Sequence, residues 1–171
     1  AELIFRYPNR VFHLRLLENE TGFSTTAVLS SVQELLSYNL VHIEEGSLTT
    51  NISANLDSEA YRFYKLVFNL YRLKRYCFID QLIEVFQTPE TIVLFGSYAR
   101  GEDIEESDID LLVLSLNKPS KARLSSLVGS MEKELKRKVT IHHLPHLHKS
   151  SDAFKNTVAN GIVLHGYLRV L

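Results

Sequence analysis

Tryptophan is absent from this chain of 171 residues, and cysteine and methionine occur once each. A single cysteine, Cys77, excludes an internal disulfide. No internal repeat or low-complexity stretch is visible. No apolar run approaches the length of a membrane span, and the first residues lack the basic and hydrophobic pattern of a secretion signal. These absences predict an ordinary soluble, cytoplasmic protein, with Cys77 as a buried thiol in an apolar helix.

An excess of charge of one sign is also absent: positive and negative residues nearly balance, and the formal net charge is −1. Hydrophobic residues make up 45% of the chain, which is near the average for globular proteins. A chain of this length and composition can bury a core and can form one or two small domains.

One short stretch combines the end of an apolar strand with glycine and a hydroxyl group. The apolar run 91–95 predicts a buried strand that stops at Gly96, where a missing side chain lets backbone N–H groups approach a ligand. Ser97 adds a hydroxyl donor, and the turn at 98–100 can open a short helix whose positive end faces an anion. The pattern predicts a phosphate-binding loop.

A second strand, near 107–113, carries two carboxylates separated by one residue. Because side chains alternate along a strand, Asp108 and Asp110 share one face while Ile109 and Leu111 point into a core. Adjacent carboxylates repel each other unless a cation lies between them, and Mg²⁺ combines a few carboxylate oxygens with phosphate oxygens and water. The motif therefore predicts a metal–nucleotide site. The plainer interpretation is a glycine turn followed by exposed acids at the start of a strand.

The run from Gly96 to Val113 resembles the signature of the minimal nucleotidyltransferases in the DNA polymerase β superfamily, and also the motif of the aminoglycoside nucleotidyltransferases. The resemblance covers roughly residues 78–171. The residues that it implies for nucleotide binding are Gly96, Ser97, Arg100 and Ser107. Those that it implies for Mg²⁺ binding and catalysis are Asp108 and Asp110.

The family normally has a third carboxylate on a later strand, and the corresponding strand here, 138–144, contains no acid. If Val139 and Ile141 are buried, Thr140 stands in the place of the acid and His142 follows it on the same face. Threonine cannot accept a proton at neutral pH, whereas a neutral histidine can act as a base or as a poor metal ligand. We therefore predict His142 as a catalytic residue, with weak or altered transfer.

The first part of the chain, which we assign to residues 1–57, shows the order helix, turn, helix and hairpin. Apolar residues at helical spacing mark two helices between residues 11 and 36, and Ser24 begins a capping segment for the second. A hairpin follows over residues 41–52, with its turn at 44–47. This order resembles the winged helix-turn-helix domains of microbial regulators.

Charge argues against DNA binding by this winged-helix-like part. Such domains bind DNA through Lys and Arg, because neutralising the phosphates supplies most of the affinity. From Leu16 through Tyr61 the chain has no Lys or Arg, and Glu44 and Glu45 lie in the wing itself. A role in protein contact or dimerisation is therefore favoured over DNA binding. DNA binding stays an alternative, because Thr25 and neighbouring polar residues can make neutral contacts to bases.

Residues 58–77 predict a linking helix between the two modules. Its apolar residues occur on more than one side, and a helix of that kind must be covered on both sides. We expect it to pack between the modules or to form a homodimer through residues 61–78. Its basic residues form a solvated stripe, with an approach to nucleic acid or an acidic partner as the alternative.

These patterns together predict an α+β protein with a winged-helix-like module, a linking helix and a small mixed-sheet nucleotidyltransferase module at 78–171. The resemblance implies Mg²⁺-dependent transfer of a nucleoside monophosphate, with AMP favoured, from ATP or another NTP to a hydroxyl acceptor. Some family members resemble antitoxins that transfer AMP to a partner toxin, so a protein acceptor is favoured. The alternative is a transcriptional regulator whose transferase domain only binds nucleotide while the winged helix binds DNA.

Overall fold

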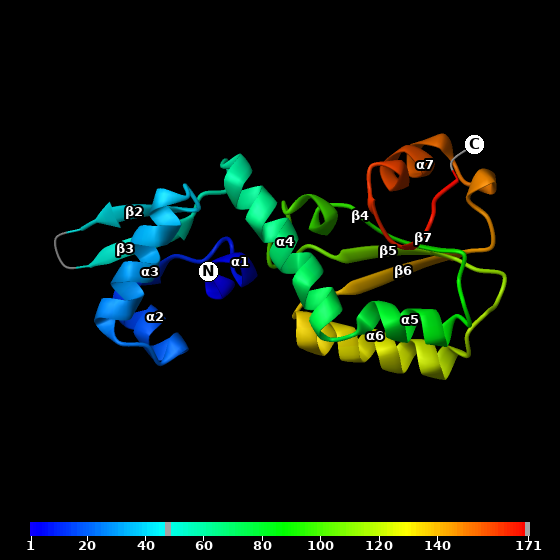
Figure 1. The fold of residues 1–171 in the computed structure, drawn as a ribbon, viewed down its shortest axis with the longest axis horizontal. Helices are drawn as coiled ribbons and strands as arrows, with labels where there is room; N and C mark the ends of the chain where they lie inside the picture. The colour runs from blue at the N-terminus through cyan, green and yellow to red at the C-terminus, as the bar shows by residue number, and fades with distance from the viewer. Residues whose placement is uncertain (47–48, 170–171) are drawn as a thin grey trace. The chain divides into compact units, whose positions relative to one another are not determined.

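The computed structural model describes residues 1–46 and 49–169 of the chain. The chain divides into two compact units, Ala1–Phe68 and Asn69–Leu171 (Figure 1). The division falls within helix α4, Glu59–Arg75, and so within the segment that was expected to link two modules. Each unit has an apolar core of its own.

The first unit packs short helices against a three-stranded sheet. Its elements before α4 are α1 (Glu2–Arg6), β1 (Phe12–His13), α2 (Leu14–Thr21), α3 (Thr25–Ser37), β2 (Val41–Glu45) and β3 (Thr50–Ala54). Strand β3 is central and runs antiparallel to both β1 and β2. Phe12 and Ile52 pair across β1 and β3 with no exposed surface, which places this pair in the core of the unit.

The predicted second helix and hairpin of the first unit are present. Ser24 caps α3 by accepting a hydrogen bond from the Ala27 N–H, and β2 and β3 form the hairpin. Part of the predicted turn, at Ser47, lies outside the described residues. The winged-helix assignment stays a prediction, supported by the order of α2, α3, β2 and β3.

The predicted helix beginning near Val11 is wrong at its start. Val11 is exposed, and the chain first forms strand β1 before α2 begins at Leu14. Neither β1 nor α1 was predicted, because two and five residues are too few to show a periodic pattern.

Helix α4 contributes buried residues to both units and also carries exposed apolar ones. Tyr61 belongs to the core of the first unit and Leu73 to the core of the second. The large apolar side chains that are exposed on this helix are Phe63, Tyr64, Val67 and Tyr71. A homodimer through this segment stays a prediction. Within the described ranges, no helix is long and apolar enough to cross a membrane.

The buried position predicted for Cys77 is wrong. The chain turns between α4 and the next helix, and Cys77 occupies that turn with a positive φ of 53°. Its thiol is exposed and free. The break itself lies where the sequence divides the linking helix, 58–77, from the module that begins at residue 78.

The second unit is built around a mixed four-stranded sheet. Its elements after α4 are α5 (Phe78–Val85), β4 (Thr91–Phe95), η1 (Tyr98–Arg100), β5 (Ile109–Leu114), α6 (Lys121–Leu135), β6 (Val139–Leu144), η2 (Leu147–Lys149), α7 (Asp152–Ala159) and β7 (Ile162–Gly166). The strand order is β6-β5-β4-β7, in which β5 and β6 are parallel and the other pairs are antiparallel. The expected α+β class with a small mixed sheet is confirmed.

Both faces of this sheet are covered, so its central strands are accessible only at their ends. Alternate residues of β4, such as Ile92 and Leu94, join the core that includes Leu82 of α5 and Met131 of α6. The residues between them join a second cluster with α7. Figure 1 shows α5 and α6 on one side of the strands and α7 on the other. A ligand can therefore reach these strands only at the polar ends of β4 and β5.

Candidate active site

The end of β4 and the start of β5 bring together the two halves of the sequence motif. Phe95 is the register partner of Asp110, so Gly96 follows directly beside that carboxylate. A Cβ added to Gly96 would lie 2.9 Å from Asp110 Oδ2, and Gly96 itself has a φ of +78°. The backbone after β4 thus lies so close to Asp110 that a residue with a side chain would not fit at position 96 without a shift.

Residues 97–101 then form a tight turn. The Ser97 carbonyl accepts hydrogen bonds from the N–H groups of Arg100 and Glu102, both at 3.0 Å, and Gly101 ends the turn with a φ of 67°. The Arg100 guanidinium lies 2.6 Å from a Glu102 carboxylate oxygen. Burial raises the pKa of the Tyr98 hydroxyl above its ordinary value, so this phenol stays neutral inside the turn.

Ser107 closes the loop that leads into β5. Its hydroxyl accepts a hydrogen bond from the Ile104 N–H at 2.9 Å, and its own N–H donates to the Ile104 carbonyl at 3.1 Å. These contacts fix the chain just before Asp108. The nucleotide contact expected of Ser107 stays a prediction.

Strand β6 presents alternate side chains to the two carboxylates. Thr140 Oγ1 lies 3.5 Å from Asp108 Oδ2, and His142 Nε2 lies 3.5 Å from Asp110 Oδ1. The expected shared face of Thr140 and His142 is therefore present. Lys138, which the sequence did not single out, adds an ammonium group 3.3 Å from Asp108 Oδ2.

Aromatic packing fixes the ring of His142. Its centroid lies 5.2 Å from that of Phe95 and 5.5 Å from that of Phe154. The ring is held in place beside Asp110 while its side chain remains 36% exposed. A histidine with this setting is both oriented and open to a ligand.

The carboxylate pair fits a metal that arrives with its substrate. Across residues 1–46 and 49–169 there is no group of three or more His, Cys, Asp or Glu placed to hold a metal ion. The side chains of Asp108 and Asp110 are 36% and 30% exposed, so both can reach a ligand. Mg²⁺ commonly binds one or two carboxylates together with substrate phosphates and water, which matches this donor set.

Comparison with known proteins decides the family. The profile of the family described as polymerase beta, nucleotidyltransferase, matches residues 79–167. The chain belongs to this nucleotidyltransferase family. The match starts in α5 and ends after β7, so it lies in the second unit and includes Gly96, Asp108 and Asp110. The expected nucleotidyltransferase module is confirmed, and this family membership makes the chain a nucleotidyltransferase enzyme.

Two curated relatives are named as putative protein adenylyltransferases of Methanocaldococcus jannaschii. One is 44% identical over 68 residues, which cover 36% of this chain and 68% of that protein. The other is 58% identical over 31 residues, which cover 18% of this chain and 21% of that protein. Both matches are to proteins whose names describe putative protein adenylyl transfer.

Two solved structures that the chain matches in part are of toxin–antitoxin complexes. A toxin–antitoxin structure with AMP-PNP is 27% identical, with a TM-score of 0.42, over 52% of this chain and 70% of that chain. A complex of a tri-AMPylated Shewanella oneidensis HEPN toxin with its MNT antitoxin is 22% identical, with a TM-score of 0.41, over 58% and 73% of the respective chains.

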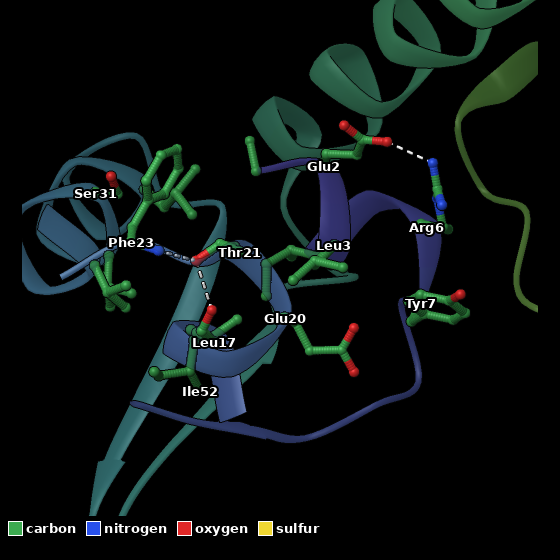
Figure 2. A pocket seen from close by; sticks show the side chains of 15 residues that line it. Glu2, Leu3, Arg6, Tyr7, Leu17, Glu20, Thr21, Phe23, Ser31 and Ile52 are labelled. Carbon is green, nitrogen blue, oxygen red and sulfur yellow. Dashed lines mark hydrogen bonds and ion pairs between the residues drawn. The ribbon is translucent and has the colours of Figure 1, made fainter. Parts of the chain in front are cut away.

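The first unit holds a cavity of about 500 Å³ that is distinct from this site. Figure 2 shows side chains of α1, α2, α3 and β3 around it, including Glu2, Arg6 and Glu20. Glu2 pairs with Arg6, while Glu20 pairs with Arg10 at 3.3 Å. The family match lies in the second unit and does not include this cavity.

Proposed function

We propose that the second unit transfers a nucleoside monophosphate, preferentially AMP, from an Mg²⁺-bound triphosphate to a hydroxyl group of a protein. The observation that carries this proposal is the close approach of Gly96 to Asp110, where β4 ends and β5 begins. Asp108 lies next to the start of β5. An open backbone beside two carboxylates suits a polyphosphate that carries a divalent cation.

Each residue of the motif has a role in this proposal. The Gly96 backbone and the Ser97 hydroxyl receive the β and γ phosphates, and Arg100 offsets their charge. Asp108 and Asp110 hold Mg²⁺, which when bound supplies charge neutralisation on the phosphates. Ser107 supports the same loop through its contact with Ile104.

The reaction joins the acceptor oxygen to the α-phosphorus and breaks the bond between the α-phosphorus and the pyrophosphate leaving group. Positioning of the two reactants and preorganised charge supply most of the acceleration. His142 takes the proton of the acceptor hydroxyl, because its ring is fixed next to Asp110 where the family's carboxylate is replaced by Thr140. Since histidine is a substitute for that acid, we expect slower transfer than a three-carboxylate site would give.

A protein acceptor is supported by the relatives that are named as putative protein adenylyltransferases. The resemblance of minimal nucleotidyltransferases to antitoxins makes a partner toxin the first acceptor to test. No residue of the chain identifies that partner, so the acceptor must be found by labelling.

Labelled ATP provides the test of this function. The protein is incubated with Mg²⁺, α-labelled ATP and a cell lysate, and we expect a labelled protein band that disappears with Asp110→Asn. A matched control is Asp80→Asn, because Asp80 is an exposed acid on α5 that pairs with Lys74 and lies outside the motif. The control should label like the wild type, and calorimetry that detects no Mg–ATP binding at millimolar nucleotide would remove the proposal.

A regulator that only senses nucleotide is the second candidate. Two observations favour it: Thr140 in the place of an acid, and the winged-helix-like order of elements in the first unit. Such a protein would bind DNA through the first unit and would leave the lysate unlabelled.

A further inference from the structure

A buried carboxylate, Asp103, lies in the loop between η1 and β5. Its side chain is 1% exposed, although it is close in sequence to Ser97 and Asp108. Burying a charge is costly unless the charge is paired and hydrogen-bonded. The partners of Asp103 therefore show which parts of the unit hold this loop in place.

The first partner is Asn69 of α4. Its side-chain amide donates to Asp103 Oδ1 at 2.7 Å and to the Tyr98 carbonyl at 3.0 Å. Both acceptors are oxygens, so the orientation of the amide is fixed by chemistry. Asn69 is 2% exposed and thereby holds two points of the loop, 98 and 103, against one helix.

The second partner is Arg137, which lies two residues before the start of β6. Its Nε lies 3.8 Å from Asp103 Oδ2, and its side chain is 4% exposed. The next residue, Lys138, accepts the Ile109 N–H through its carbonyl at 2.8 Å and places its ammonium group by Asp108. The position of Arg137 therefore determines where β6 starts alongside the two carboxylates.

Helix α4 also anchors the helix that leads to Arg137. Arg72 donates to the Leu135 carbonyl at 2.9 Å and to the Glu134 carbonyl, which are the last residues of α6. Lys136 then ends α6 with a φ of 55°. One buried network thus reaches both the phosphate loop and the start of β6.

We infer that Asp103, Asn69 and Arg137 form a clamp that positions the phosphate loop and the start of β6 on either side of Asp108 and Asp110. The inference rests on the proposed function, since it assigns these three residues the task of setting nucleotide affinity. They are positioning residues, because each acts through the loop or the strand that it holds. A displacement of about 1 Å in such a site can cost up to roughly a hundredfold in rate, so the clamp has a measurable effect.

Stability and positioning can be separated at this clamp. Removing one member of a buried ion pair leaves an uncompensated charge, whereas replacing both members with apolar residues of similar shape is often neutral for stability. The double variant Asp103→Leu with Arg137→Met therefore keeps the unit folded while it removes the connection between loop and strand. Asp103→Asn keeps the shape and the contact with Asn69 but removes the charge opposite Arg137, so it should lose less of the function than the double variant.

The test measures nucleotide affinity and local hydrogen exchange in the full chain. For the double variant we expect a melting temperature close to that of the wild type, a Kd for Mg–ATP raised at least about tenfold, and faster amide exchange in residues 97–107. Asp103→Asn should give a Kd between these two. A matched control is Glu84→Gln with Arg123→Gln, an ion pair of the same unit whose side chains are 75% and 59% exposed, and it should leave both measurements unchanged.

A folded double variant with wild-type Kd and wild-type exchange in the loop would overturn the clamp. If the double variant fails to fold, Asp103→Asn decides by the same two measurements. If the wild type itself binds no Mg–ATP, the proposed function fails. The exchange of residues 97–107 then still decides whether Asp103 holds the loop.

Discussion

Gly96 combines a backbone conformation and a close contact that other residues cannot adopt together. Its φ of +78° is disfavoured for residues with a Cβ, and that Cβ would meet Asp110 Oδ2 at 2.9 Å. Gly22, at the end of α2, has a similar φ of +71° with no atom within 4 Å of an added Cβ. The two glycines therefore share the backbone strain but not the contact.

We predict that Gly96→Ala abolishes Mg–nucleotide binding, because the methyl group displaces Asp110 or closes the approach to the backbone. Gly22→Ala should leave binding intact. Both changes should lower the free energy of unfolding by about 1 to 2 kcal/mol, the cost of a left-handed backbone with a Cβ. Calorimetry with Mg–ATP and chemical denaturation measure the two effects, and equal nucleotide affinities in the two variants would contradict the assignment of Gly96.

Thr140 offers a gain-of-function prediction. Its hydroxyl lies 3.5 Å from Asp108 Oδ2, and it is the register partner of Asp110, so Thr140→Asp adds a third carboxylate to the pair. Without metal the variant should be less stable, since three carboxylates repel one another. With Mg²⁺ it should transfer faster by on the order of a hundredfold, the lower range for an added general base.

Initial rates of labelling against Mg²⁺ concentration measure this change. Thr140→Asn serves as the control, because it has a similar size without the charge. If Thr140→Asp loses stability both with and without Mg²⁺ and labels no faster, the position is not that of the family's acid.

His142 allows packing and proton transfer to be told apart. His142→Phe keeps a ring between Phe95 and Phe154, whereas His142→Ala removes the ring as well as the nitrogens. If the imidazole is the base, both variants should lose roughly a hundredfold or more in turnover with little change in nucleotide Kd. Unchanged nucleotide affinity and turnover in His142→Ala would end this role.

The candidate site was predictable to the extent that its residues are adjacent in sequence. Gly96, Asp108 and Asp110 lie at the ends of strands that apolar runs predict. The alternation of side chains along a strand predicts the face on which His142 lies. The clamp of Asp103 was missed because Asn69 and Arg137 are each 34 residues away from it, and each resembles an ordinary surface residue in its local sequence. Such partners emerge only from tertiary packing.

At the scale of single elements, capping serines mark the starts of three helices, of which the sequence analysis named the one at Ser24. Ser24, Ser120 and Ser151 each accept a hydrogen bond from the N–H three residues later. An element without such a signal was missed: β1 has only two residues and pairs only with β3. Local chemistry thus predicts helix ends well and contact-dependent pieces poorly.

We predict that Ser120→Ala lowers the free energy of unfolding of the second unit by about 1 kcal/mol, because the Arg123 N–H loses its acceptor at the start of α6. Ser120→Asp should retain the cap. Ser125→Ala, in the exposed interior of the same helix, should be neutral or slightly stabilising, since alanine has the higher helix propensity. Urea denaturation measures all three, and an equal effect at positions 120 and 125 would contradict the capping role.

At the scale of the whole molecule, charge is distributed unevenly along a chain whose sum is close to zero. The stretch from Leu16 through Tyr61 has no Lys or Arg, and it makes up most of the first unit. The motif that matches the enzyme family lies entirely in the second unit. If the first unit is a winged helix, as the sequence predicts, its second helix and hairpin carry none of the cations that would bind DNA phosphates.

This charge distribution gives a prediction that separates the enzyme from the regulator. We expect the full chain to show no measurable affinity for duplex DNA at about 150 mM salt, because a protein that neutralises no phosphates gains nothing from counterion release. Glu44→Lys with Glu45→Lys places two cations on exposed positions at the end of β2, and it should create weak binding that falls as salt rises. Fluorescence anisotropy with labelled duplex, titrated with salt, measures both proteins. Tight, salt-sensitive binding by the wild type would instead favour the regulator, with Lys and Arg outside residues 16–61 neutralising the phosphates.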